Sequence, residues 1–537
     1  MNLNINGMLL ECKEALDKKF FDIITVVFFS VMFLLIIHNP FRISHDCAGI
    51  LQTTQMIILD GKRPYTDIEL INPPLIFYLN SIPVLIAHFF SVSIISVFSL
   101  LVFGLTIWST LTIRHLLSRL PSRFTKMQAG FICLSLVVFG LFLWRQENFG
   151  QREHLFILMY LPFFILRWIR WEGGFINMRH AIALGTIGAI GVCIKPYFVV
   201  ISLAPEIYWC FSKRNVRNFI KPEMLAFIGS GLIYAVHFVF LPADIKEAFF
   251  GSTLPFVLKG YHAYNNPMIA LFQWRVIYIL LAITLLPFFI HYIIAESDEW
   301  NITRPLAFMT MASFGIYLIQ HKGWGYHLIP FCYGSLMISS VIVVLIQPRL
   351  FVVKNDRIPD RVFRVPITKY QICLIVLGLL FYWDLKIMIA RTVPLSNNPI
   401  ISAISQYSEE NEAIEFISTS VTPGAQILLQ LNRRRASRYG NHFVLPFIRV
   451  IWEEEPLLAA KEEERYLNNL THDILTSRPR LIFVANGSNN QGMPVDFNFL
   501  QYLVKIGFID RSMKDYEYLT EAYDFAVYRL KDYDTGL

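Results

Sequence analysis

Long apolar runs alternate with short polar segments between residues 20 and 391. Runs of this kind, about 16–24 residues long, are typical of helices that cross a hydrocarbon core of about 30 Å. The pattern predicts spanning helices at residues 21–38, 93–113, 128–144, 155–170, 224–241, 271–294, 305–320, 328–346 and 371–391. The predicted fold class is therefore a polytopic α-helical membrane protein.

Two further apolar segments leave the topology open. Residues 75–90 are short for a span, and residues 181–211 carry Lys195-Pro196 at their middle, so they form one kinked span or two half-length helices. The basic loops are 114–126, 213–221 and 347–369. Because cytoplasmic loops concentrate Lys and Arg, we place 75–90 on the membrane surface and predict two helices in 181–211. This gives about eleven spans, a cytoplasmic N-terminus and an external C-terminus.

The composition changes after about residue 394. The segment from Pro394 onward holds 14 basic and 19 acidic residues, against 33 and 21 before it. Its pattern predicts helices at 409–418, 452–475 and 497–505, and strands at 425–431, 481–485 and 525–530. Strands alternating with helices indicate a small α/β domain. The predicted organisation is a transmembrane module at 1–393 and an extracytoplasmic α/β domain at 394–537.

Composition supports the membrane assignment and excludes other classes. Hydrophobic residues make up 55% of the chain and charged residues only 16%, whereas soluble domains average about 25% charged. The net charge is +7, and its basic excess lies in the membrane part, so nothing favours nucleic acid as a partner. Seven cysteines, mostly within apolar runs, argue against a disulfide framework. The first apolar run is too long for a cleaved signal peptide.

The first external loop, residues 39–92, is unusually acidic for this chain. It contains Asp46, Asp60, Asp67 and Glu69. Asp46 stands directly before an amphipathic surface helix predicted at 47–59. It is a candidate N-cap of that helix and a candidate general base at the membrane surface, and one residue can have both roles. Asp60 and Asp67 stand in Gly- and Pro-containing turns.

Three other polar positions adjoin predicted helices. Arg152, Glu153 and His154 run straight into an apolar helix, where buried charge is costly without a partner; a solvated turn is the alternative. Lys195 is an intramembrane lysine that either binds a phosphate as a point charge or snorkels to the surface. The tight turn at 320–327 holds Lys322, Trp324, Tyr326 and His327, which suit a phosphate or sugar or form an interfacial aromatic belt.

The order of residues in the first loop resembles a known family. An acid follows the first span, then Gly61-Lys62-Arg63-Pro64-Tyr65-Thr66-Asp67, then Glu69 and Asn72-Pro73-Pro74-Leu75. This arrangement resembles the first external loop of GT-C glycosyltransferases, in particular the aminoarabinose transferase and protein O-mannosyltransferase-like branch. The resemblance covers roughly residues 20–391 and extends to the predicted topology.

The resemblance implies an inverting transferase that moves a sugar from a polyprenyl-phosphate carrier to a glycan or lipid acceptor on the outer face of the cytoplasmic membrane. It implies Asp46 as the general base and Glu153 as a second catalytic acid. Many members have Asp-Glu where this chain has Asp46-Cys47, so the adjacent acid is missing. Candidates for binding phosphate or substrate are Arg152, Lys195, Lys322, His327, Tyr326, Trp324 and Tyr65.

The resemblance also bears on cofactors. Several members have a carboxylate at the position of Glu69 that joins a metal site, so Glu69 and His154 are candidate ligands of a divalent metal. No nucleotide cofactor is expected, because the acidic loop faces away from the cytoplasm. Two alternatives remain at this stage: a lipid or glycan transporter or flippase, and a polymerase or ligase that uses a polyprenyl-diphosphate-linked glycan.

Overall fold

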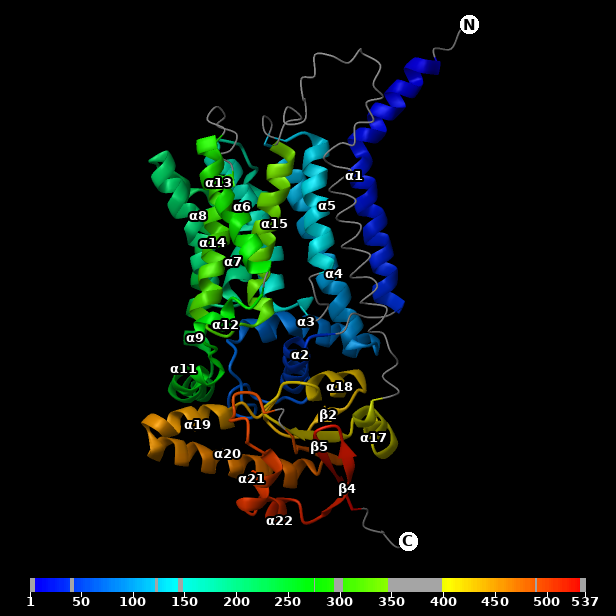
Figure 1. Cartoon of the computed structure of the whole chain (residues 1–537), viewed down its shortest axis with the longest axis vertical. Coiled ribbons are helices and arrows are strands. Elements are labelled where there is room, and N and C mark those ends of the chain that lie inside the picture. The colour runs from blue at the N-terminus through cyan, green and yellow to red at the C-terminus, as the bar shows by residue number, and fades with distance from the viewer. Residues whose placement is uncertain are drawn as a thin grey trace, which may run out of the picture. The chain divides into compact units, whose positions relative to one another are not determined.

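The structure is a computed structural model, and it describes residues 5–38, 43–120, 124–142, 148–274, 276–293, 303–345, 398–487 and 490–531 (Figure 1). The chain forms two compact units. The first comprises Met1–Phe41, Ser99–Tyr234 and Pro267–Arg391, and the second comprises Arg42–Phe98, Ala235–Asn266 and Thr392–Leu537. The second unit therefore unites the first polar loop with the C-terminal residues.

Helices occur at each predicted span that lies within the described residues. Their bounds are α1 Ile5–His38, α4 Ile94–Leu117, α5 Lys126–Phe142, α6 Arg152–Trp171, α7 Met178–Cys193, α8 Phe198–Lys213, α9 Pro222–Phe240, α13 Val276–Ile293, α14 Thr303–Gln320 and α15 Ile329–Leu345, with the short turns η2 Arg217–Ile220, α12 Met268–Leu271 and η6 Gly325–Leu328. The predicted split of 181–211 is confirmed, because α7 and α8 are separate helices. The basic loop 347–369 and the span 371–391 lie outside the described residues.

The apolar helices make this an integral membrane protein. Among the described residues, Ile94–Leu117, Arg152–Trp171, Pro222–Phe240 and Gly325–Leu345 are long and apolar enough to cross a membrane. Shorter apolar helices include Leu75–Phe90 and Met178–Cys193. The total of eleven spans stays a prediction.

Small residues bring α7 against α6 in the first unit. A Cβ atom at Gly188 would lie 2.9 Å from the Cβ of Phe163, and one at Gly191 would lie 3.0 Å from the Cβ of Met159. Glycine therefore allows a close approach of the two helices, as small residues commonly do between helices in membranes. Because α7 follows α6 through a short turn and runs back along it, its last residues return to the level where α6 begins.

A buried charge network holds the other end of α6. Arg167 donates to Glu206 Oε1 at 2.6 Å and to Glu223 Oε1 at 3.0 Å, and Trp171 Nε1 donates to Glu206 Oε2 at 3.0 Å. Arg170 Nε donates to Glu223 Oε1 at 2.9 Å. Two arginines and two glutamates balance in charge, which is the condition for burying ions in an apolar bundle. The network joins α6 to α8 and α9.

The second unit contains two helices of the first loop, α2 His45–Ile58 and α3 Leu75–Phe90. It also contains α10 Ala243–Lys246, η3 Glu247–Thr253, α11 Leu254–Gly260 and η4 Tyr261–Tyr264. The predicted helices at 47–59 and 75–90 are thus confirmed as helices. A Cβ atom at Gly260 would lie 2.3 Å from the Cβ of Phe447, so only glycine lets α11 pack this closely on helix α19 (Val444–Glu454).

The C-terminal part of this unit is built on a mixed sheet of five strands in the order β2-β1-β3-β5-β4. The strands are β1 Ala413–Ile417, β2 Arg434–Arg435, β3 Leu481–Ala485, β4 Tyr516–Ala522 and β5 Phe525–Leu530. Strand β1 is parallel to β2 and β3, and β5 is antiparallel to β3 and β4. The remaining helices are α17 Pro399–Tyr407, α18 Gly424–Gln430, α19, α20 Pro456–Ser477, α21 Phe499–Lys505 and α22 Phe508–Ser512.

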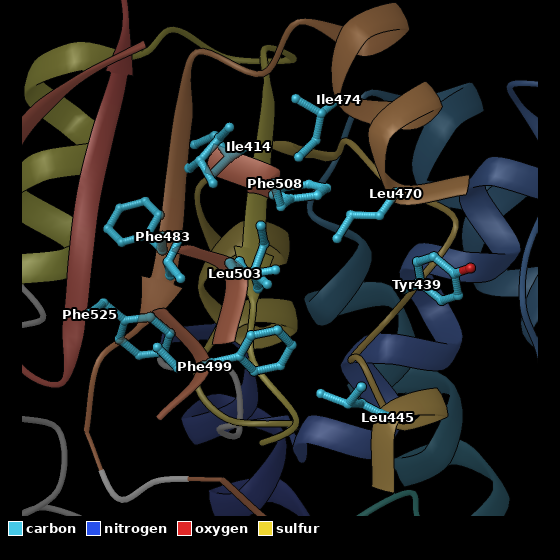
Figure 2. Packing of buried hydrophobic residues seen from close by; sticks show 14 of the residues in the cluster. Ile414, Tyr439, Leu445, Leu470, Ile474, Phe483, Phe499, Leu503, Phe508 and Phe525 are labelled. Atoms are coloured by element: carbon cyan, nitrogen blue, oxygen red, sulfur yellow. The ribbon is translucent and has the colours of Figure 1, made fainter. Parts of the chain in front are cut away.

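The core of this part lies between the sheet and its helices. Figure 2 shows Phe483 of β3 and Phe525 of β5 near Phe499 and Leu503 of α21, with Leu470 and Ile474 of α20 packed from another side. Every residue of β3 is buried. A fully apolar strand of this length is typical of the centre of a sheet covered on both faces.

Two predicted elements in this region are wrong. The helix predicted at 409–418 is in fact the strand β1, because Ile414 and Ile417 enter the core and the strand pairs with β2 and β3. The strand predicted at 425–431 is the helix α18, which buries Ile427 and Leu428. Short apolar runs do not distinguish a strand from a buried helix, so the tertiary partner decides.

Candidate active site

The first unit contains a buried ion pair at the start of α6. Glu153 lies in the first turn of α6 with 1% of its side chain exposed, and Lys195 Nζ donates a hydrogen bond to its Oε1 atom. His327 Nε2 lies 3.7 Å from the same oxygen. The other oxygen, Oε2, accepts no hydrogen bond from any described residue. Three predicted site residues from separate segments therefore meet here.

The local sequence explains how Lys195 reaches Glu153. Residues 194–197 separate α7 from α8, and Phe198 N donates to the Lys195 carbonyl at 3.0 Å, which forms a tight turn. The close approach of α7 to α6 brings this turn to the beginning of α6. Lys195 is buried, so it is a paired lysine rather than a snorkelling one.

Aromatic rings surround the ammonium group of Lys195. The Nζ atom lies 5.5 Å from the ring centroid of Tyr197 and 5.6 Å from that of Tyr326. Tyr326 stacks on Trp324 with centroids 5.8 Å apart, and its ring meets that of His327 edge-on at 4.5 Å. Cation–π contact favours the charged form of a lysine. The predicted turn at 320–327 thus forms part of this cluster.

Several cations gather around the cluster. Lys195, Arg152 and Lys322 all act electrostatically on the imidazole of His327. Lys322 is buried in the turn after α14, and burial lowers its pKa to about 8. A lysine with such a pKa is still mostly charged at neutral pH. The positive charges of three side chains thus act on one imidazole, which is an arrangement suited to an anion.

His154 follows Glu153 but belongs to a different set of contacts. Its Nδ1 atom accepts a hydrogen bond from Gly150 N at 3.1 Å, and its Nε2 atom lies 3.2 Å from the Tyr333 hydroxyl. A neutral imidazole has one donor and one acceptor nitrogen, so the backbone N–H fixes the proton on Nε2. Neither nitrogen then has a lone pair directed at a metal.

Asp46 lies in the second unit, in the first turn of α2. The N-cap of α2 is Ser44, whose side chain accepts a hydrogen bond from Cys47 N at 3.0 Å. Ser44 rather than Asp46 is therefore the N-cap, and Ser44 has the extended backbone that a cap requires. Asp46 Oδ1 lies 3.6 Å from His45 Nε2, and 20% of the Asp46 side chain is exposed.

Glu69 is held by the C-terminal residues of the same unit. Its carboxylate oxygens each accept from an Arg465 guanidinium nitrogen at 3.4 Å, and its backbone N–H donates to the Arg438 carbonyl at 3.1 Å. Burial raises the pKa of Glu69, and Arg465 opposes that effect only in part. A carboxylate facing an arginine does not fit a metal ligand. Among the described residues no group of three or more His, Cys, Asp or Glu side chains is placed to hold a metal ion.

Tyr65 lies in the polar loop that follows α2 and forms a hydrogen bond within it. Its hydroxyl donates to the Asn72 carbonyl at 2.6 Å, and its ring lies 4.8 Å from that of Phe249. Asp67 Oδ2 accepts from Arg63 N at 2.9 Å, as expected for an Asp that shapes a turn. Asp60 lies 3.7 Å from Arg434. Residues 145–147, in the polar segment before Arg152, lie outside the described residues.

Two residues that contact the candidate site were not selected from the sequence. Tyr197 covers Lys195, and its hydroxyl donates to Gln320 Oε1 at 2.9 Å, which links the α7–α8 turn to the end of α14. Its position directly after Lys195-Pro196 was the available signal. Tyr333 contacts His154 from α15, and nothing in the sequence sets it apart from the other aromatic residues of that span.

Comparison by sequence finds no protein-family model that matches the chain, and no curated protein matches it. Comparison by structure shows the fold of a GT-C glycosyltransferase, as the first loop predicted. One match is to ArnT from Cupriavidus metallidurans, solved bound to undecaprenyl phosphate, with a TM-score of 0.55 and 11% sequence identity. It covers 94% of this chain and 97% of the ArnT chain.

Proposed function

We propose that this protein is a glycosyltransferase that moves a sugar from a polyprenyl-phosphate carrier to a glycan or lipid acceptor on the outer face of the cytoplasmic membrane. The observation that carries the proposal is the match to ArnT over nearly the full length of both chains, in a structure of ArnT bound to a polyprenyl phosphate. In this proposal about eleven helices span the membrane, and the second unit and the C-terminus are extracytoplasmic.

Asp46 is the proposed general base. Its carboxylate takes the proton of the acceptor hydroxyl while that oxygen attacks the anomeric carbon of the donor. The new bond joins the acceptor oxygen to the anomeric carbon, and the bond from that carbon to the carrier phosphate oxygen breaks. Polyprenyl phosphate leaves with the bonding electrons. A single displacement of this kind inverts the anomeric centre, and a positioned base typically contributes about 10²–10⁴-fold to the rate.

The cluster around Lys195 is the proposed site for the carrier phosphate. Lys195 is held at this position by its bond to Glu153, and a lysine ammonium binds a phosphate as a point charge. Arg152 and Lys322 supply further positive charge, which stabilises the negative charge that develops on the leaving phosphate. The stacked rings of Trp324 and Tyr326 provide an apolar surface for the sugar.

Glu153 has two proposed roles in this cluster. Its Oε1 atom accepts a hydrogen bond from Lys195 and so holds that side chain in place. Its buried Oε2 atom, which accepts no hydrogen bond from the described residues, is an acceptor for a hydroxyl group of the donor sugar. Glu69 and His154 are engaged by Arg465, Gly150 and Tyr333, so no step of the proposed transfer uses a metal held by these two residues.

The test is transfer by the purified full-length protein. Undecaprenyl-phosphate monosaccharides carrying a neutral hexose, an aminopentose or an N-acetylhexosamine are incubated with detergent-extracted envelope lipids and glycans, and thin-layer chromatography follows the label. We expect one donor to yield a labelled product with release of undecaprenyl phosphate. Turnover only with a diphosphate-linked glycan would favour a polymerase or ligase. Movement of lipid across proteoliposomes without transfer would favour a flippase.

A further inference from the structure

We infer that the C-terminal α/β region positions the catalytic base, and that Gln426 of α18 is the positioning residue. The inference rests on the proposed function, since it assigns Gln426 a role through Asp46. The hydrogen bond of its side-chain amide goes to the backbone of Ile43 rather than to a carboxylate. Gln426 contacts the backbone from which the helix α2, and with it Asp46, begins.

The contact lies at the N-terminal end of α2. Gln426 Nε2 donates a hydrogen bond of 2.7 Å to the carbonyl oxygen of Ile43. Ile43 is buried and directly precedes the N-cap Ser44, whose carbonyl accepts from Ala48 N at 2.9 Å. A buried carbonyl requires a donor, and this one receives it from a side chain 383 residues further along the chain.

The other end of α2 is held by the same region. Arg435 Nη2 contacts Met56 Sδ at 3.2 Å, and Arg434 lies 3.7 Å from Asp60 just beyond the helix. Helix α18 also packs against α2. Because a short helix moves as a rigid rod, fixing both ends also fixes the carboxylate of its first turn.

Asp46 lies three residues from Ile43, so a shift of the Ile43 carbonyl moves the base almost directly. Proton transfer demands hydrogen-bond geometry, and a displacement of about 1 Å in an active site can cost about 10²-fold in rate. The hydrogen bond from Gln426 prevents such a shift of the Ile43 carbonyl. A C-terminal region that only recognised the acceptor would have no need to hold the backbone in front of the base.

The matched variants all lie on α18. Gln426→Glu keeps the shape of the side chain but replaces the N–H donor by an acceptor that repels the Ile43 carbonyl, and Gln426→Ala removes the side chain. Gln430→Ala is the control, since Gln430 is exposed at the last residue of the same helix. Turnover of the accepted undecaprenyl-phosphate monosaccharide is measured with full-length protein in detergent, together with hydrogen exchange of the peptide covering residues 43–50.

We expect Gln426→Glu and Gln426→Ala to lower kcat about tenfold with the KM of donor and acceptor within about twofold of the parent. Amide exchange in the first turn of α2 is expected to accelerate in both variants and to remain unchanged in Gln430→Ala. In an Asp46→Asn background the Gln426 variants are expected to cause no further loss of activity, because the residue acts through the base. A purely structural defect would lower the residual activity as well.

Three outcomes would overturn the inference. These are a raised acceptor KM with unchanged kcat, unchanged exchange at the start of α2, or an additive loss in the double variant. The outcomes that test the proposed function are different. Full activity of Asp46→Asn would remove Asp46 as the base whatever the Gln426 variants do, while the exchange experiment would still report whether Gln426 holds α2.

Discussion

Lys195 and Glu153 form a buried ion pair between the α7–α8 turn and the first turn of α6, although 42 positions separate them in the chain. The pair is nearly inaccessible to water, with 9% and 1% of the side chains exposed. His327 approaches the same carboxylate oxygen from a third segment. The pair therefore ties together the elements that we assign to the carrier phosphate.

Breaking this ion pair from one side is expected to destabilise the protein. Lys195→Met leaves the carboxylate of Glu153 buried without its partner, which typically costs about 3–5 kcal/mol. Thermal unfolding in detergent measures the loss. The double variant Lys195→Met/Glu153→Gln buries no charge, so we expect most of the stability to return while transfer activity stays low. An unchanged unfolding temperature in the single variant would contradict the pairing.

Lys322 gives a prediction about pH. Burial lowers the pKa of its ammonium to about 8, so its positive charge is present below that pH and is lost as the pH rises through it. The affinity of the protein for undecaprenyl phosphate is expected to fall between about pH 7 and 9. In Lys322→Arg the charge persists, and the fall is expected to disappear. Identical pH profiles for the two proteins would contradict a role of Lys322 in phosphate binding.

The contact between Glu69 and Arg465 gives a prediction about stability. Arg465→Ala removes the partner of a buried carboxylate, which we expect to cost about 1–2 kcal/mol at pH 7, because Arg465 is 34% exposed. Burial already raises the pKa of Glu69, so acidification protonates it and the cost should shrink toward pH 5. Unfolding curves at both pH values measure this, and Glu69→Gln/Arg465→Ala should show no such pH dependence. If Arg465→Ala lost more stability at pH 5 than at pH 7, the ion pair between Glu69 and Arg465 would be contradicted.

Close packing of α7 on α6 can be tested at Gly188. A Cβ atom there would lie 2.9 Å from Phe163, so Gly188→Ala is expected to force the helices apart at a cost of about 1–3 kcal/mol and to weaken binding of undecaprenyl phosphate through Lys195. Gly229→Ala is the matched control, because nothing lies within 4 Å of a Cβ atom at that position in α9. If the two substitutions changed stability equally, helix propensity rather than close packing of α7 on α6 would explain the change.

Most helices of the membrane part could be predicted, because a long apolar run is a local feature of the sequence. Apolar length defined the helices, and Pro196 together with the distribution of basic residues distinguished two helices in 181–211 from one. The C-terminal region was harder, because β1 and α18 are short and their state depends on distant partners. Position alone did not identify Ser44 as the cap of α2, since Asp46 is an equally suitable residue type two positions later.

In the candidate site, too, individual residues could be predicted from the sequence but their contacts could not. Glu153, Lys195 and His327 could be selected as polar residues in apolar surroundings, and the structure brings these three together. Their pairing was not predictable, because it depends on the close packing of α6 and α7 and on the turn after α14. Likewise, Glu69 was selected as a carboxylate without its partner Arg465, which lies 396 residues away.

The central claim is that Asp46 is the base of a transfer from a polyprenyl-phosphate sugar. The most direct measurement is single-turnover release of undecaprenyl phosphate by Asp46→Asn, compared with Asp67→Asn, which changes a carboxylate of the same loop that accepts a hydrogen bond from Arg63 N. We predict a loss of about 10²–10⁴-fold for Asp46→Asn with donor binding retained, and near-parent rates for Asp67→Asn, because its amide oxygen can still accept that bond. Parent-like release by Asp46→Asn would contradict the claim.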